Sequence, residues 1–311
     1  DADPEMKRLM LGRAAKLERL GLAERVGSAQ WELKPALEER LRELGTRRDM
    51  IATMHRALRR GGIDRGADLA MHAEAEAPPI VGRLVERGLH DELTGSAYAV
   101  IDGVDGRAHH VRFADLDATG DGLAGSIVEV RQFEDRTGRT RTVVAVRSDL
   151  DLPAQVTAPG ATWLDRQAVS RTGADVVDAG FGREVKAALG ARAEHLAGEG
   201  LARRQGQRVL FARDLLDTLR CRELEATAAR LSDETGLPYR PSAPGEYAAG
   251  TYNRRLTLAS GRFAMLDDGM GFQLVPWTPS LEPHLGRQVS GIVGPGGGVD
   301  WSFGRKRGLS L

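Results

Sequence analysis

The side chains that could bind a metal ion or act as a nucleophile are few and scattered. The chain has seven histidines, and none of them has the spacing of a metal site. His109 and His110 are adjacent in a segment with strand-like alternation, so we expect their rings on opposite faces, one half-buried and one solvated. The single cysteine, Cys221, excludes an internal disulfide and a thiolate zinc site. We expect Cys221 to be structural.

The carboxylates and the glycine-rich stretches also lack the spacing of a catalytic site. Asp115, Asp117 and Asp121 are similar to a calcium loop only in part, because the Gly and the bidentate Glu of an EF-hand are missing, and a solvated turn is the expectation. The glycines at 294–298 precede a strand-like segment, whereas a P-loop needs Gly-Lys-Ser or Gly-Lys-Thr before a helix. Whether the chain is an enzyme stays open, but the sequence predicts no catalytic residue, no metal and no cofactor.

Arginine is the remaining residue type that could carry a function. The chain has 44 basic and 44 acidic residues, and most of the basic ones are arginines, whose planar forks suit phosphate groups. A GC-rich genome would produce the same bias, and an ordinary solvated surface is the alternative interpretation. The candidate DNA-binding residues are basic side chains expected on exposed helices, on hairpins and in the tail: Arg47, Arg48, Arg56, Arg59, Arg60, Arg203, Arg204, Arg208, Arg213, Arg305, Lys306 and Arg307.

The elements that must position these arginines are predicted to occur twice. Residues 4–58 predict a helix, a turn at Gly21, a short strand pair, a second helix after Pro35 and a third helix over 48–60. Residues 182–231 repeat the order of helix, glycine turn, strand pair and long helix. The runs KLERLGLAERVGSAQWELKPAL and HLAGEGLARRQGQRVLFARDLL share Gly-Leu-Ala, a basic residue and a glycine turn. We interpret both as winged-helix modules, in which one helix enters the major groove and the hairpin follows the DNA backbone.

The remaining segments read as short strands. Alternation and Asp-Gly or Thr-Gly turns predict strands between Gly95 and Ser148 and again from Gly245, and closure into a barrel would remove exposed edges. The predicted fold class is α+β and multi-module, with two winged-helix-like modules alternating with two small β-barrels of the OB or SH3 kind. The predicted boundaries are a winged-helix-like module over 1–60, a linker over 61–80, a small β-barrel over 81–150, a second winged-helix-like module over 151–235, and a C-terminal small β-barrel with a basic tail over 236–311.

Composition favours a soluble protein. Hydrophobic residues make up 41% and charged residues 28% of the chain, as in globular proteins. No stretch approaches the roughly 20 apolar residues that cross a bilayer, and the first residues do not resemble a signal peptide. We therefore expect a cytoplasmic location and no membrane partner.

Long runs of the sequence resemble a known protein region. ATWLDRQ (161–167), GLARRQGQRVLFARDLLDTLR (200–220), LASGRFAMLDDGMGFQLVPW (258–277) and VDWSFGRKRG near the end are similar to the C-terminal region of bacterial plasmid relaxase/mobilisation nucleases, a domain of unknown function. The resemblance covers essentially the whole chain. In that family the nuclease lies upstream and uses a tyrosine nucleophile with a His-hydrophobic-His metal motif, neither of which is identifiable here.

The resemblance implies a role in conjugative DNA mobilisation. On this basis the chain is expected to be a non-catalytic, DNA-binding and relaxosome-assembly region that holds plasmid transfer-origin DNA for the upstream nuclease. The alternative is a protein-docking module that the coupling protein of type IV secretion, or another relaxosome or secretion-system protein, recognises. No small-molecule cofactor is expected in either case.

Overall fold

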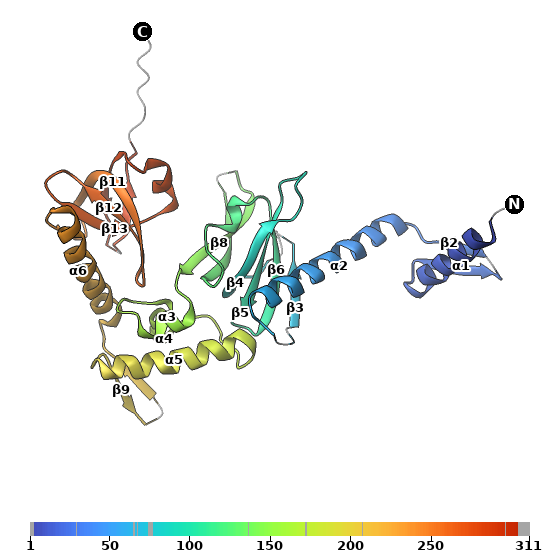
Figure 1. The fold of residues 1–311 in the computed structure, drawn as a ribbon, viewed down its shortest axis with the longest axis horizontal. Helices are drawn as coiled ribbons and strands as arrows, with labels where there is room; N and C mark the ends of the chain where they lie inside the picture. Colours follow the sequence, from blue (N-terminus) through green and yellow to red (C-terminus); the bar gives the residue numbers. More distant parts are fainter. Residues whose placement is uncertain are drawn as a thin grey trace, which may run out of the picture. The chain divides into compact units, whose positions relative to one another are not determined.

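The computed structural model is an α+β protein whose helices and strands follow the predicted class. It describes residues 3–28, 30–64, 66, 68–73, 77–135, 137–171, 173–206, 208–295 and 297–303. The chain divides into two units, one up to Gly62 and one from Ile63 onward (Figure 1).

The first unit consists of two helices joined by a β-hairpin. Its elements are α1 (Pro4–Arg19), β1 (Ala23–Gly27), β2 (Gln30–Leu33) and α2 (Leu37–Arg60). Asp3 caps α1 by accepting a hydrogen bond from the amide of Glu5 at 3.1 Å. The prediction of two helices after Pro35 was wrong, because α2 is continuous. Gly45 lies inside α2 with open space around it, and an exposed helix tolerates a glycine at a cost of about 1 kcal/mol.

The second unit begins with a six-stranded sheet in the order β3-β6-β5-β4-β7-β8. The strands are β3 (Asp68–His72), β4 (Ile80–Leu89), β5 (Ala97–Gly103), β6 (Arg107–Phe113), β7 (Ile127–Glu134) and β8 (Thr140–Ser148), with the short 3-10 helix η2 (Asp117–Thr119) before β7. Within the segment for which we predicted a linker, β3 pairs in parallel with β6. The other neighbours in this sheet are antiparallel. Gly106, with φ +82°, forms the turn between β5 and β6, as the Asp-Gly pair predicted.

Helices follow the sheet and pack against part of it. They are α3 (Leu152–Thr157), α4 (Trp163–Val169), α5 (Gly180–Gly198) and α6 (Leu215–Thr235), and the hairpin of β9 (Ala202–Gln205) and β10 (Arg208–Phe211) separates α5 from α6. Leu164 of α4 and Phe181 and Val185 of α5 are fully buried in one cluster with Ile127 of β7. This apolar cluster fixes α4 and α5 at one end of the sheet (Figure 1).

A five-stranded sheet ends the described chain, in the order β13-β12-β11-β14-β15. Its elements are β11 (Tyr247–Leu258), β12 (Gly261–Asp267), β13 (Phe272–Pro276), the 3-10 helix η3 (Pro279–His284), β14 (Gln288–Val293) and β15 (Val299–Trp301). Tyr252, Leu266 and Val275 are at most 1% exposed in its core. On its other face Met265 and Phe272 pack with Leu231 of α6. The strands and the turn at Asp268-Gly269 agree with the sequence prediction.

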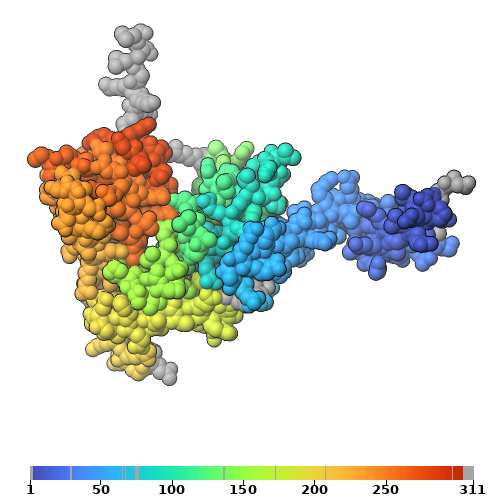
Figure 2. Space-filling view, in the orientation of Figure 1, coloured from blue at the N-terminus to red at the C-terminus, as the bar shows by residue number. Residues whose placement is uncertain are grey.

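The surfaces of both units can be followed along the chain in the space-filling view (Figure 2). In the part of the chain that the structure describes, no helix combines the length and the apolarity needed to cross a bilayer.

Candidate nucleic-acid interface

Arg47, Arg48, Arg56, Arg59 and Arg60 all lie on α2, and all five side chains are exposed. Arg48, Arg56 and Arg59 are spaced at i, i+8 and i+11, which places them on one face of the helix. Arg60 is four residues beyond Arg56 and borders this face, whereas Arg47 projects from the side of the helix that carries Met54 and Leu58. From Arg48 to Arg60 the helix rises by about 18 Å. We call Arg48, Arg56, Arg59 and Arg60 the α2 basic face.

The α2 basic face has the charge and exposure of a surface that can meet an anion. Met54, Ala57 and Leu58 are buried on the opposite side of the helix, so the arginines point away from the apolar side. Among the described residues, Arg48 and Arg56 form no ion pair. Positive charge in the last turn of a helix also interacts favourably with the helix dipole.

The backbone of α1-β1-β2-α2 recurs in α5-β9-β10-α6, and we call these the first and second repeats. In each repeat a glycine with positive φ ends the first helix, Gly21 at 71° and Gly200 at 75°. The residue after this glycine donates its amide to a carbonyl near the end of the first helix. The carbonyl of that same residue accepts from the amide of the first residue after the hairpin. These bonds are Leu22 N to Leu17 O (2.9 Å) and Lys34 N to Leu22 O (3.0 Å) in the first repeat, and Leu201 N to Leu196 O (2.9 Å) and Ala212 N to Leu201 O (2.9 Å) in the second.

The two hairpins carry different charges on their outer faces. In the second repeat Arg203 is opposite Leu210 and Gln205 is opposite Arg208, while Val209 on the other face joins the apolar core. The arginines at 203 and 208 are both exposed. In the first repeat, by contrast, Glu24 is opposite Glu32. Only the second hairpin therefore presents a basic outer face.

The other predicted residues of the second repeat differ in whether they are paired. Arg204 is exposed but forms an ion pair with Glu194 of α5. Arg213 is exposed just before α6. The predicted residues of the tail, Arg305, Lys306 and Arg307, lie outside the described residues.

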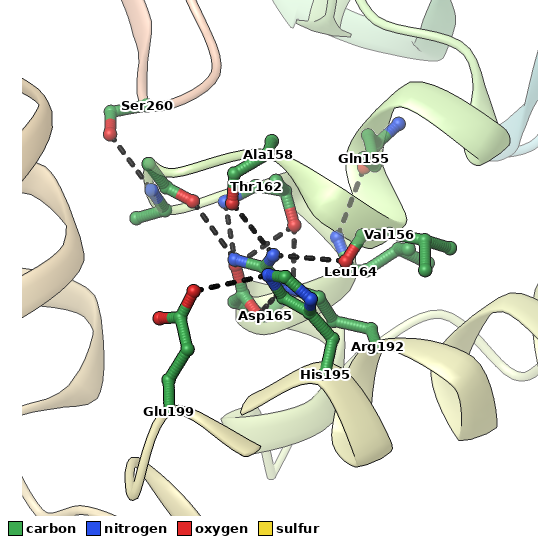
Figure 3. Close-up of polar contacts among 12 residues, drawn as sticks. Gln155, Val156, Ala158, Thr162, Leu164, Asp165, Arg192, His195, Glu199 and Ser260 are labelled. Carbon is green, nitrogen blue, oxygen red and sulfur yellow. Dashed lines mark hydrogen bonds and ion pairs between the residues drawn. The ribbon is translucent and has the colours of Figure 1, made fainter. Parts of the chain in front are cut away.

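A buried ion pair holds α5, and with it the second repeat, against α4 (Figure 3). Thr162 and Asp165 form a capping box at the start of α4, in which each side chain bonds to the other residue's backbone amide. Asp165 is 0% exposed and Arg192 is 2% exposed. Arg192 Nε donates to Asp165 Oδ1 at 2.9 Å, and Nη2 donates to Oδ2 at 3.0 Å. The remaining guanidinium hydrogens bond to the carbonyls of Val156, Ala158 and Gly160.

The same region joins α6 to the C-terminal sheet. The buried carboxylate of Glu223 on α6 accepts from the amides of Ala259 and Ser260, each at 2.8 Å. Ser260 Oγ accepts from the amide of Ala161 at 2.9 Å, as Figure 3 shows. Arg166 Nη2 donates to the carbonyl of Ser260 at 2.6 Å. Sequence reasoning missed this network, although the Thr-x-x-Asp spacing of ATWLDRQ was a signal for the capping box.

Several arginines outside the candidate set are neutralised within the second unit. Arg262 donates from Nε to Asp149 at 2.7 Å and from Nη1 to Asp121 at 2.6 Å, and Arg255 donates to Asp121 at 2.9 Å. The hydrogen bonds that Arg262 donates to the Asp149 carboxylate raise the pKa of Arg262. Burial alone would raise the pKa of Asp121, but its bonds to Arg262 and Arg255 lower it. Asp121, expected in a solvated turn, therefore links β12 and β11 to the segment before β7.

The histidine prediction was wrong in part. His109 and His110 point to opposite faces of β6, yet both are buried, at 4% and 1% exposure. His110 stacks on Tyr98 of β5, with ring centroids 5.2 Å apart, and burial lowers the pKa of His110 to about 4. Both faces of this strand are covered, which alternation alone cannot reveal. Within the described ranges no three His, Cys, Asp or Glu side chains are grouped so that they could hold a metal ion.

Comparison with known families places the chain in one of them. The family model described as a protein of unknown function (DUF3363) matches residues 10–144 and 130–310. The chain belongs to the DUF3363 family. Both sheets and the second repeat of this DUF3363 protein lie within the matched segments, as does the first repeat from residue 10 onward, but the description of the family assigns no activity. No curated protein matches the chain.

Proposed function

We propose that this chain is a DNA-binding region of a conjugative relaxase, which holds plasmid transfer-origin DNA for a nuclease domain and supports relaxosome assembly. The observation that carries the proposal is the α2 basic face, whose exposed arginines point away from the buried side of the helix. A helix of this kind fits the major groove of DNA, which is about 12 Å wide. Arg203 and Arg208 on the outer face of the second hairpin add basic groups of the kind that contact phosphates.

In this proposal the two repeats are winged-helix-like modules and the two sheets are small barrels of the OB or SH3 kind. The hairpin of the second repeat is then the wing that follows the DNA backbone. The chain itself contributes no catalytic residue and no cofactor. The relaxase assignment rests on the sequence runs that resemble plasmid mobilisation proteins.

Salt dependence of DNA binding tests the proposal. A random-sequence DNA duplex and its single strand are titrated with the purified chain over a salt series, with fluorescence anisotropy as the readout. Each neutralised phosphate contributes about −0.9 to the slope of log affinity against log salt. The Arg48→Gln, Arg56→Gln and Arg59→Gln triple variant is expected to reduce the magnitude of this slope by about 2.7, which is three times that contribution.

The matched control removes arginines that are exposed but already paired. Arg183 pairs with Asp178 and Arg230 pairs with Glu234, so Arg183→Gln and Arg230→Gln are expected to leave the salt slope unchanged. Absence of binding at low salt, or equal slopes for the triple variant and this control, would refute DNA binding through α2.

We propose protein docking as the second candidate, on a different observation. Met6, Leu9 and Met10 of α1 are 52%, 66% and 66% exposed, and α1 has no buried residue. A grouped apolar surface of this kind is typical of protein contact sites. The coupling protein of type IV secretion or another relaxosome protein is the proposed partner. Binding through this surface would depend little on salt, because it releases few counterions.

A further inference from the structure

A cavity of about 660 Å³ lies in the second unit, between the six-stranded sheet and α4. Trp163, Arg166, Gln167 and Ser170 line one wall. Their spacing of i, i+3, i+4 and i+7 places them on one side of a helix. The opposite wall comes from the start of β4, the β5–β6 turn and the edge formed by β7 and β8. None of the residues of the α2 basic face lines this cavity.

The middle of the cavity is apolar. Val81 of β4 and Val104 at the end of β5 are neighbours, joined by a hydrogen bond from the amide of Val104 to the carbonyl of Val81 at 2.9 Å. Trp163, which is 7% exposed, faces the same space from α4. Apolar walls with a few charged groups at the rim are the usual composition of a small-molecule site.

One end of the cavity is cationic. Arg131 of β7 and Arg147 of β8 both pair with Glu129, so these three side chains carry one net positive charge. Arg166 of α4 also lines the cavity, and its Nη2 donates to the carbonyl of Ser260. Arginine forks of this kind bind phosphate oxygens.

The other end of the cavity holds a carboxylate beside an imidazole. Asp105 Oδ1 accepts from the backbone amide of Arg107 at 3.1 Å and lies 3.0 Å from His109 Nε2. His109 Nδ1 is in turn 3.1 Å from His72 Nε2. The Asp105 side chain is 43% exposed, so its oxygens can accept hydrogen bonds from a ligand.

The sheet order sets the distance between the two ends. β4 lies between β5 and β7, and Val81 is directly opposite Glu129. Two strand spacings, about 10 Å, therefore separate the Asp105 end from the arginine end. The α-ammonium and the α-carboxylate of a free amino acid cannot reach both ends, because they are attached to one carbon. A nucleoside monophosphate can, because its phosphate and its base edge are at opposite ends of the molecule.

We propose that this cavity binds one unstacked nucleotide, with the phosphate at Arg131 and Arg147 and the base edge at Asp105. The choice of a nucleotide rests on the proposed function. A carboxylate accepts hydrogen bonds from exocyclic amino groups, which adenine, cytosine and guanine have and thymine lacks. Thymine presents only its N3–H, which is flanked by two carbonyl oxygens that repel a carboxylate, so the cavity discriminates against thymine.

Calorimetric titration of the full chain with dAMP, dCMP, dGMP and dTMP tests the proposal. Inorganic phosphate, which lacks the nucleoside, and deoxycytidine, which lacks the phosphate, are titrated as control ligands. We expect dCMP to bind roughly tenfold more tightly than dTMP, phosphate or deoxycytidine, since one charge-assisted hydrogen bond is worth about this factor. If inorganic phosphate binds saturably and as tightly as dCMP, the cavity is only an anion site and the proposal is overturned.

Two variants test which end of the cavity binds the base and which end binds the phosphate. Asp105→Asn is expected to weaken dCMP about tenfold and to leave dTMP unchanged, whereas Arg131→Gln is expected to weaken all four nucleotides alike. Arg183→Gln, on an exposed pair of α5, is the control and should change nothing. Absence of saturable binding, dTMP binding as tightly as dCMP, or binding that both cavity variants retain would refute the nucleotide site.

The same preparations separate this inference from the proposed function. DNA binding without binding of any mononucleotide would overturn the cavity assignment alone. Mononucleotide binding without salt-dependent DNA binding would overturn the proposed function and leave the cavity as a nucleotide site.

Discussion

Replacing Arg192 by alanine should destabilise the second unit far more than any exposed arginine does. The substitution leaves the Asp165 carboxylate, which is 0% exposed, without its ionic partner. It also removes donors from the carbonyls of Val156, Ala158 and Gly160. Breaking one partner of a buried ion pair costs about 3–5 kcal/mol. That cost is a large part of the roughly 5–15 kcal/mol by which a domain is stable.

Urea unfolding followed by circular dichroism measures this loss. Arg183→Ala on the same helix is the matched control, because its pair with Asp178 is 72% and 71% exposed. An exposed pair contributes at most about 1 kcal/mol. A loss below about 1 kcal/mol for Arg192→Ala, within the range of an exposed pair, would show that the network does not hold α4 and α5 together.

The double variant Arg192→Met with Asp165→Leu sharpens the test. Removing both charges leaves no unpaired ion, so the double variant should be more stable than Arg192→Ala alone. The losses of unfolding free energy of Arg192→Met and Asp165→Leu are also measured separately. If the loss in the double variant equals the sum of these two losses, packing rather than charge pairing accounts for the effect.

Three further outcomes follow from the second unit. Gly160→Ala places a methyl group against the carboxylate of Glu223 and the hydroxyl of Ser260, and we expect a loss of about 1–3 kcal/mol in urea unfolding; a neutral result would mean that the loop can shift freely. The pKa of His110 falls from an ordinary value of 6.5 to about 4 on burial, so between these pH values the unfolded chain binds a proton that the folded chain does not. The free energy of unfolding should therefore decrease by up to about 3 kcal/mol as the pH falls through this window, and His110→Phe, measured at both ends of the window, should remove this dependence. Arg262→Gln removes the charged hydrogen bonds to Asp149 and Asp121, and we expect it to lower the free energy of unfolding by about 2 kcal/mol. An unchanged midpoint of thermal unfolding would show that these bonds do not stabilise the second unit.

Local patterns in the sequence predicted much of the fold. The Gly-Leu-Ala runs correctly predicted the helix, hairpin and helix of each repeat, because a glycine turn and apolar spacing act within a few residues. Strands β5 to β8 and β11 to β13 followed from alternation and Asp-Gly turns. The strand β3 was missed, because its residues Asp68–His72 lie between Gly-rich and Pro-rich stretches and are specified by their pairing with β6.

The candidate site could be predicted only as a set of exposed arginines. Whether an arginine is available depends on partners that are distant in the sequence. Arg262 meets Asp121 at a separation of 141 residues, and Arg192 meets Asp165 at a separation of 27. No local pattern distinguishes these paired arginines from Arg48 or Arg56. The cavity beside α4 could not be predicted either, because it forms where this helix faces residues of four strands, β4, β6, β7 and β8.

In the two repeats, the residues that determine the fold differ from the residues that are exposed to a partner. Their common backbone is set by the turn glycines and by inward leucines such as Leu22 and Leu201, whereas the outward residues of the hairpins differ in charge. Side chains on the outer face of a hairpin can therefore change without loss of the scaffold. In a chain that carries the scaffold twice, the outer face of one hairpin can be basic, while the other repeat, with Glu24 opposite Glu32 on its hairpin, carries its exposed arginines on α2 instead.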